Sequence, residues 1–219
     1  MTERFRPFHA KILLVVLHLV GVLGILGFFE GFVDANTFVR LSPFNLLLTA
    51  SLLFVFVAVR ARLFVFFLAC LLIGFLAELI GVQTGLPFGE YTYGESLGPK
   101  WWGVPLVIGV NWFLVAVGSQ ALLRLRTNDI WIRTIGAALV MVGFDLLVEP
   151  VAIQIDFWHW SGGEIPLQNY AGWLLVGLII QAVFAVVFKK EEANHRLNPM
   201  ALPVLAVQLL FFAALNLML

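Results

Sequence analysis

The sequence alternates between long apolar runs and short polar segments, the pattern of helices that cross a membrane. A helix needs about 20 residues to cross the hydrocarbon core of a bilayer. Seven such runs use up most of the 219 residues and leave no room for a soluble domain. We therefore predict one all-α, multi-pass transmembrane domain over residues 1–219, with spans at about 11–29, 44–59, 63–82, 103–123, 131–153, 169–188 and 200–219.

Composition excludes several classes of protein. The chain is 62% hydrophobic and 12% charged, whereas a soluble domain is about 45–50% apolar and about 25% charged. The formal net charge is zero, so charge indicates no nucleic-acid partner. The single cysteine, Cys70, excludes a disulfide within the chain and a multi-cysteine metal site. The histidines and acids show no metal-ligand spacing, and we predict no metal and no cofactor.

The positions of the basic residues predict an orientation. Cytoplasmic loops are enriched in Lys and Arg. With the N-terminus inside, only Arg40 and Lys100 fall in outer loops. We predict N-inside, C-outside in the plasma membrane, the reverse of a microbial rhodopsin, whose retinal lysine the last run also lacks. The inner basic residues are Arg4, Arg6, Lys11, Arg60, Arg62, Arg124, Arg126, Arg133, Lys189, Lys190 and Arg196.

Three acids lie within outward spans, where an ionisable side chain costs several kcal/mol and points to function. Asp145 and Glu149 are four residues apart and so share one helix face, about 6 Å from each other. Two carboxyls in a poorly solvated site cannot both ionise easily, which places an acid beside a base. Glu78 is the third candidate, and Pro150 predicts a kink or local unwinding at this depth.

Two outer segments combine glycine and proline with many aromatic residues. Residues 83–100 and 154–168 are too rich in Gly and Pro for a regular helix and too apolar for a free linker. We predict two ordered outer loops that cap a pocket. The segments that follow them share Gly, Pro-Leu, Asn and Trp residues, which predicts parallel repeats over 63–123 and 131–188.

The same region resembles a known family. Between Glu78 and Trp173 the chain carries, in order, TGLPFGEYTYGESLGPKWWGVPL, DLLVEPVA, FWHW and PLQNYAGW. These strings are similar to the membrane hydratases of carotenoid biosynthesis, of the bisanhydrobacterioruberin hydratase and gamma-carotene 1',2'-hydratase type. The resemblance implies cofactor-independent addition of water to the terminal isopropylidene double bond of an acyclic carotenoid, which gives a tertiary alcohol.

The residues suit that chemistry. A carboxyl at membrane depth can protonate an alkene, aromatic faces can stabilise the cation, and a second carboxylate can deprotonate the attacking water. We expect Asp145, Glu149 and Glu78 to divide these roles, with Asp145 as the first candidate for the proton donor. Asn111 and Asn169 are expected to orient water or a carboxyl. The expected substrate-binding residues are Tyr91, Tyr93, Trp101, Asn111, Trp112, Trp158, His159, Trp160, Asn169 and Trp173.

Two other functions use the same acids. A lycopene-cyclase-type enzyme shares the protonation step but captures the cation with an internal double bond. A small proton-coupled transporter belongs to a different class. On the hydratase hypothesis the partners are water, the lipid bilayer, other enzymes of the carotenoid pathway and a lycopene-like C40 or C50 polyene, which enters laterally between helices. No nucleic-acid partner is expected.

Overall fold

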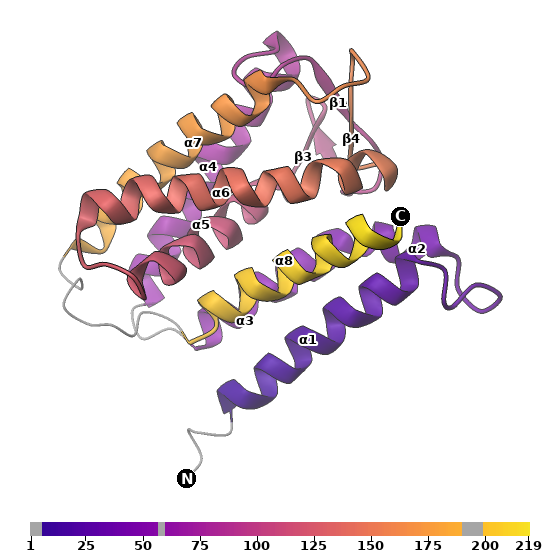
Figure 1. Cartoon of the computed structure of the whole chain (residues 1–219), viewed down its shortest axis with the longest axis horizontal. Coiled ribbons are helices and arrows are strands. Elements are labelled where there is room, and N and C mark those ends of the chain that lie inside the picture. The colour runs from indigo at the N-terminus through magenta and orange to yellow at the C-terminus, as the bar shows by residue number, and fades with distance from the viewer. Residues whose placement is uncertain (1–5, 57–59, 190–198) are drawn as a thin grey trace.

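The structure is a computed structural model that describes residues 6–56, 60–189 and 199–219. Helices and short strands follow each other along the chain (Figure 1). Their bounds are α1 Arg6–Ile25, α2 Ala35–Arg40, α3 Ser42–Val55, α4 Arg60–Thr84, β1 Tyr91–Tyr93, β2 Lys100–Trp101, β3 Val104–Pro105, α5 Ile108–Arg124, α6 Ile130–Gln154, β4 Trp158–Trp160, α7 Leu167–Val187 and α8 Ala201–Met218.

The prediction of a helical membrane protein is confirmed. Among the described residues, five helices are long and apolar enough to cross a membrane: α1, α4, α6, α7 and α8. The other two predicted spans correspond to α3 and α5, which are apolar but shorter, at 14 and 17 residues. The number of seven spans and the orientation therefore stay predictions. Residues 57–59 of the second span and the basic residues Arg4, Lys190 and Arg196 lie outside the described part.

Two predicted boundaries shift for local reasons. The first run was expected to reach residue 29, but α1 ends at Ile25 because Gly27 adopts a positive φ of 76°. The N–H groups of Gly27 and Phe28 bond back to the carbonyls of Gly24 and Leu23, which closes the helix end. The fourth run was expected to start at residue 103, but β2 and β3 pair antiparallel there and α5 starts at Ile108.

Helix α6 continues through Pro150, so the expected local unwinding is wrong, whereas the alternative of a kink stays a prediction. A proline removes one backbone donor, and side chains of a neighbouring helix can satisfy the freed backbone in a membrane. The missing N–H of Pro150 is the helical partner of the Leu146 carbonyl, and Asn216 of α8 donates a hydrogen bond of 2.6 Å to the adjacent carbonyl of Leu147. The helix therefore carries Asp145 and Glu149 on one continuous face.

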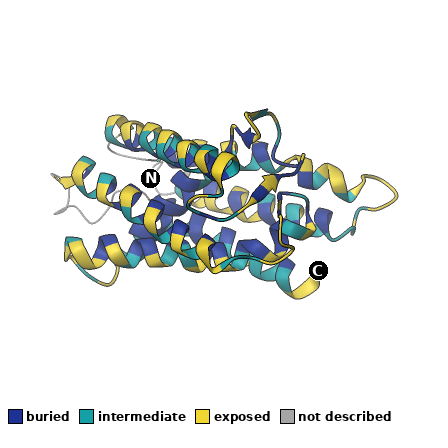
Figure 2. Ribbon diagram, turned by 90° about the horizontal axis from the view of Figure 1, so that it is seen from above, coloured by how far each residue is buried: buried dark blue, intermediate teal, exposed yellow. Residues whose placement is uncertain are grey.

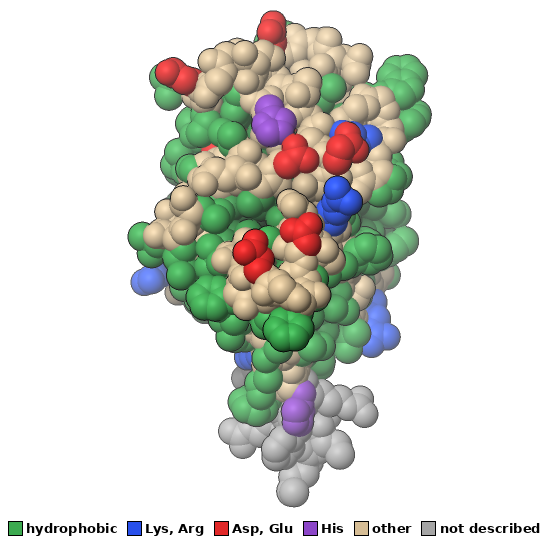
Figure 3. Space-filling model, turned by 90° about the vertical axis from the view of Figure 1, so that its right-hand side faces the viewer, with side chains coloured by type: hydrophobic (Ala, Val, Ile, Leu, Met, Phe, Trp, Pro, Cys, Tyr) green, Lys and Arg blue, Asp and Glu red, His purple; other side chains and the backbone are tan. Residues whose placement is uncertain are grey.

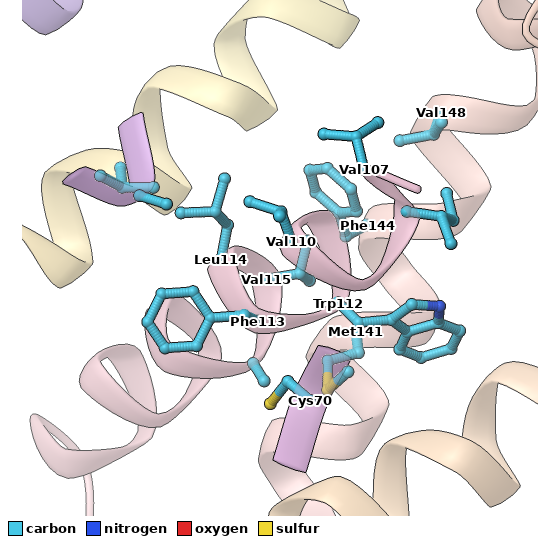
Figure 4. Packing of buried hydrophobic residues seen from close by; sticks show 14 of the residues in the cluster. Cys70, Val107, Val110, Trp112, Phe113, Leu114, Val115, Met141, Phe144 and Val148 are labelled. Carbon is cyan, nitrogen blue, oxygen red and sulfur yellow. The ribbon is translucent and has the colours of Figure 1, made fainter. Parts of the chain in front are cut away.

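Helix α5 forms the centre of the bundle. It packs against α3, α4, α6, α7 and α8, and its residues from Ile108 to Gln120 are almost all buried (Figure 4). The surrounding helices are buried on the side facing α5 and expose large apolar side chains on the other (Figure 2). Such an apolar exterior suits contact with lipid tails rather than water.

The two outer loops are ordered and joined to each other. Strand β1 pairs antiparallel with β4, with Tyr91 opposite Trp160 and Tyr93 opposite Trp158. The strands lie at one end of the bundle, together with α2 and the C-terminus (Figure 1). Acidic side chains gather on this end face (Figure 3). The paired strands β1 and β4 therefore form one lid over the C-terminal ends of α4 and α6.

Candidate active site

Glu78 is a buried carboxylate near the C-terminal end of α4, and three side chains donate hydrogen bonds to it. Its Oε2 accepts from the Tyr91 hydroxyl at 2.5 Å and the Tyr93 hydroxyl at 2.8 Å. Its Oε1 accepts from the Trp112 indole N–H at 3.0 Å. Both carboxylate oxygens of Glu78 therefore accept hydrogen bonds from the protein. The side chain is only 5% exposed, so these donors take the place of water.

Glu149 on α6 has a matching environment. Its Oε2 accepts from the indole N–H groups of Trp158 at 3.0 Å and Trp160 at 2.8 Å. Its Oε1 accepts from the amide of Asn169 on α7 at 3.0 Å. Each glutamate thus receives two donors from the strand that follows its own helix and a third from the next long helix.

The strand geometry explains how these donors reach the carboxylates. Successive side chains of a strand point to opposite faces. In β1 the buried Tyr91 and Tyr93 flank the exposed Thr92, and in β4 the buried Trp158 and Trp160 flank the exposed His159. The register brings the four aromatic rings onto the inner face of the lid, above the helix ends.

The two tyrosines stay protonated and act as donors. Burial raises the pKa of the Tyr91 hydroxyl, and the negative charge of Glu78 raises it further. The same two causes raise the pKa of Tyr93. A neutral phenol beside a carboxylate donates its hydrogen bond to the charged oxygen. Tyr91 and Tyr93 therefore stabilise the ionised form of Glu78.

Asp145 lies one helix turn before Glu149 and is fully buried. Asn169 donates 2.6 Å to its Oδ2, so one amide group bridges the two carboxyls. The other oxygen, Oδ1, has no hydrogen-bond partner in the described part of the chain. A buried charge without a partner is costly, so this environment favours a carboxyl pair that holds a proton.

A small cavity lies between Glu78 and Glu149. Its volume is about 20 Å³, which is room for about one water molecule. Neither Lys nor Arg occurs among the described residues that line it. The lining residues are Glu78, Phe88, Tyr91, Tyr93, Ile108, Asn111, Glu149, Trp158, Trp160, Asn169 and Trp173. We refer to this space as the carboxylate cavity.

Most of the residues predicted for the site converge here. Trp112 stands behind the lining, with its ring stacked on Trp173 at 4.0 Å between centroids. Asp145 is likewise not part of the lining, but it accepts a hydrogen bond from the lining residue Asn169.

Two predicted residues lie elsewhere. Trp101 is 56% exposed and stacks on Phe75, and His159 points outward to Asp156, 2.8 Å from its carboxylate. Two lining residues, Phe88 and Ile108, were not predicted. Phe88 lies in the loop whose apolar character had indicated a lid, whereas Ile108 has no distinguishing sequence feature.

No group of three or more His, Cys, Asp or Glu side chains is placed to hold a metal ion among the residues that the structure describes. The groups gathered around the carboxylate cavity are carboxyls, aromatic faces and amides.

Comparison with known proteins gives the same family as the quoted strings. Residues 41–219 match the family described as carotenoid biosynthesis protein. The chain is 31% identical to the bisanhydrobacterioruberin hydratase of Haloarcula japonica, in an alignment that covers 98% of this chain and 78% of that protein. No solved structure matches. The chain therefore belongs to the carotenoid biosynthesis protein family.

Proposed function

We propose that this protein is a carotenoid hydratase, which adds water to the terminal isopropylidene double bond of an acyclic carotenoid end. The observation that carries the proposal is the carboxylate cavity, in which Glu78 and Glu149 face one space of about 20 Å³ among aromatic rings. The name of the Haloarcula japonica relative supports the same reaction class.

The Asp145–Glu149 pair supplies the proton. Asn169 binds both carboxyls, and the unpartnered Oδ1 of Asp145 disfavours a doubly ionised pair. Glu149 lines the cavity whereas Asp145 does not, so Glu149 presents the shared proton to the alkene and Asp145 is a positioning residue. This assignment differs from the sequence-based expectation, which favoured Asp145 as the donor.

The aromatic walls stabilise the cation. Protonation at the less substituted alkene carbon uses the π electrons for a new C–H bond and leaves a tertiary cation next to it. The faces of aromatic rings attract cations through the ring quadrupole. Tyr91, Trp158, Trp160 and Trp173 line the cavity, and their carbon faces offer no competing nucleophile.

Water then captures the cation, and Glu78 accepts the proton that the water loses. Three donors stabilise the ionised form of Glu78, and it shares none of these bonds with a second carboxyl as Glu149 does with Asp145, which suits a base. One C–O bond forms, and the proton on Glu78 returns to the Asp145–Glu149 pair through water in the shared cavity. The balance is one water added and no redox change, so the proposed reaction is that of a hydro-lyase running in the hydration direction.

Polar groups around the cavity favour hydration over cyclisation. A cyclase must keep water from the cation while an internal double bond folds back onto it. Here Asn111, Asn169 and two carboxylates line a space that fits about one water, which suits capture by water.

The matching environments of Glu78 and Glu149 also support two parallel repeats, over residues 63–123 and 131–188. In each copy a carboxylate near the outer helix end receives two donors from the following strand and one from the next long helix. On this proposal each repeat contributes one carboxylate to the shared cavity, and the whole domain lies in the plasma membrane with seven spans.

The decisive experiment is expression in a lycopene-producing host, followed by mass spectrometry of the pigments. A gain of one water mass supports hydration, whereas an isomer of unchanged mass contradicts it. Glu149→Gln cannot carry the proton, so the yield of hydrated pigment should fall by at least about a hundredfold. Full activity of Glu149→Gln would overturn the assignment of the donor.

Glu78→Gln separates protonation from water capture. In membranes incubated with D₂O, this variant should exchange deuterium into the terminal group of lycopene without adding water, since Glu149 still deuterates the alkene and the cation can then lose a different hydrogen, from a terminal methyl group, back to Glu149. Glu149→Gln should show neither exchange nor hydration. Hydration by Glu78→Gln at the wild-type rate would exclude Glu78 as the base.

A further inference from the structure

Three cavities lie in series between the lipid-facing surface and the catalytic carboxylates. An outer groove of about 230 Å³ shares Ser42, Asn45 and Phe211 with a middle chamber of about 60 Å³. The middle chamber shares Ile108, Asn111 and Trp158 with the carboxylate cavity of about 20 Å³. Because neighbouring cavities share wall residues, they lie side by side in a row whose volumes decrease towards Glu149.

The outer groove opens where the protein meets lipid. It lies between α1, at the edge of the bundle in Figure 1, and α3. Its lining includes Val20, Phe44 and Leu48, which are 41%, 68% and 41% exposed. Exposed apolar residues on long apolar helices contact the hydrocarbon core of the bilayer, so a lipid-soluble molecule can reach this groove without crossing water.

Phe211 of α8 separates the groove from the chamber. It lines both spaces, and its ring packs edge-on to the His18 ring at 5.8 Å between centroids. It lies against α1 at Gly21, where an added Cβ would come within 3.3 Å of the ring. Phe211 forms the wall between the groove and the middle chamber together with Ser42 and Asn45, and an aromatic ring in such a wall can rotate to open it.

We propose that the acyclic end of the carotenoid enters laterally from the bilayer between α1 and α3, passes Phe211 and reaches Glu149 through the middle chamber. The rest of the polyene stays in the outer groove and the surrounding lipid. The inner spaces of about 60 and 20 Å³ must widen to take even a slender isoprenoid end, and a bulky ring would need a much larger rearrangement, so the route favours acyclic ends. This inference rests on the proposed function for the class of substrate.

Neighbouring lipid-facing positions provide matched variants. Leu48 lines the groove, whereas the adjacent Leu47 is 49% exposed and lies outside its lining. On α1, Val20 lines the groove and Leu19, 54% exposed, does not. Tryptophan at any of these positions adds the same bulk next to lipid, but only Leu48→Trp and Val20→Trp fill the route.

In the lycopene-producing host, Leu48→Trp and Val20→Trp should reduce the hydrated fraction of pigment by about tenfold per amount of inserted protein, as expected for steric overpacking. Leu47→Trp and Leu19→Trp should convert pigment like the wild type. Normal conversion by both groove variants would overturn the proposal. An equal loss in all four variants would also overturn it, because the effect would then not depend on the groove.

A second measurement separates this inference from the proposed function. Full-length protein purified from the same host in the Glu149→Gln background should retain lycopene, and adding Leu48→Trp should lower the retained pigment by a similar factor. Leu47→Trp should leave it unchanged. Retention that depends on Leu48 without hydration by the wild type would support the route and reject the hydratase. Hydration by the wild type together with retention that does not depend on Leu48 would support the hydratase and reject the route.

Discussion

The absence of a side chain at Gly81 leaves the space through which the Tyr91 hydroxyl reaches Glu78. This glycine lies one turn beyond Glu78 on α4, and a Cβ there would come within 2.7 Å of the Tyr91 hydroxyl and 2.9 Å of the Phe88 ring. Gly81→Ala should push the phenol away from the carboxylate and reduce pigment conversion by about tenfold, the value of a lost charged hydrogen bond. Pigment mass spectrometry measures the change.

Gly143→Ala is the matched control. Gly143 lies inside α6, and an added Cβ would meet no atom within 4 Å. Alanine is the better helix former by about 1 kcal/mol, so this variant should convert pigment normally and unfold at a slightly higher temperature. Wild-type conversion by Gly81→Ala would show that the contact between Tyr91 and Glu78 does not matter for the reaction.

Asp156 gives the lid a dependence on pH. Its carboxylate bonds to the His159 ring at 2.8 Å and accepts from the Glu95 backbone N–H at 2.9 Å, which ties the two outer loops together. The hydrogen bond with His159 is the main cause that lowers the pKa of Asp156, and the Glu95 N–H adds to it. A lowered pKa in the folded state stabilises the protein above the unfolded value of about 3.9, and this stabilisation is lost as the pH falls.

Asp156→Asn tests this linkage. Asparagine tolerates the positive φ of 57° at this position, so the change removes mainly the charge. The variant should be less stable than the wild type at pH 7, by less than about 1 kcal/mol because the group is half exposed and screened. The difference should narrow below about pH 4. Thermal unfolding in detergent at several pH values measures it, and an equal difference at pH 3 and pH 7 would contradict the charge-based explanation.

The pairing of β1 with β4 brings hydrogen-bond donors from two separate loops to Glu78 and Glu149. The alternation puts Tyr91 and Tyr93 inside and Thr92 outside. Deleting Thr92 makes the tyrosines adjacent, so they must point to opposite faces. We expect the deletion to remove one donor from Glu78 and conversion to fall by at least about tenfold. Thr92→Val, which keeps the alternation, should convert pigment normally, and activity in the deletion variant would show that the register is not needed.

The same elements show what the sequence could and could not predict. Glu78, Asp145 and Glu149 stood out because ionisable residues are rare in apolar runs, and the structure places them in one region. Tyr-Thr-Tyr and Trp-His-Trp each carry the alternation of a strand. Their pairing joins segments separated by α5 and α6, and no local pattern specifies such a long-range contact.

Residue type alone could not separate functional from peripheral aromatics. Trp101 and Trp158 are both tryptophans in an outer loop, yet one lies in the β2–β3 hairpin and the other faces Glu149. His159 sits between two site residues and points the other way. The predicted helix boundaries are wrong for a similar reason, because some apolar residues belong to turns, as after Ile25, or to the hairpin before Ile108.

In the whole molecule, the distribution of charge and the position of the strands indicate the same end for the proposed active site. The acids that the sequence assigns to outer loops gather at the end that carries the strands (Figure 3). The lid and the carboxylate cavity lie at this same end, and the α5–α6 connection lies at the other (Figure 1). If the positive-inside rule holds, the lid faces the outside of the cell.

Cysteine labelling tests this orientation directly. The native Cys70 is fully buried and should react poorly, so an added cysteine reports its own location. Gly162 lies in the outer loop after β4, and a Cβ there meets no atom within 4 Å. Gly162→Cys should react with a membrane-impermeant maleimide on intact cells. Asn128→Cys, between α5 and α6, should react only after lysis. The reverse pattern would place the lid and the new hydroxyl group at the cytoplasmic surface, and labelling of both sites on intact cells would exclude an odd number of spans between them.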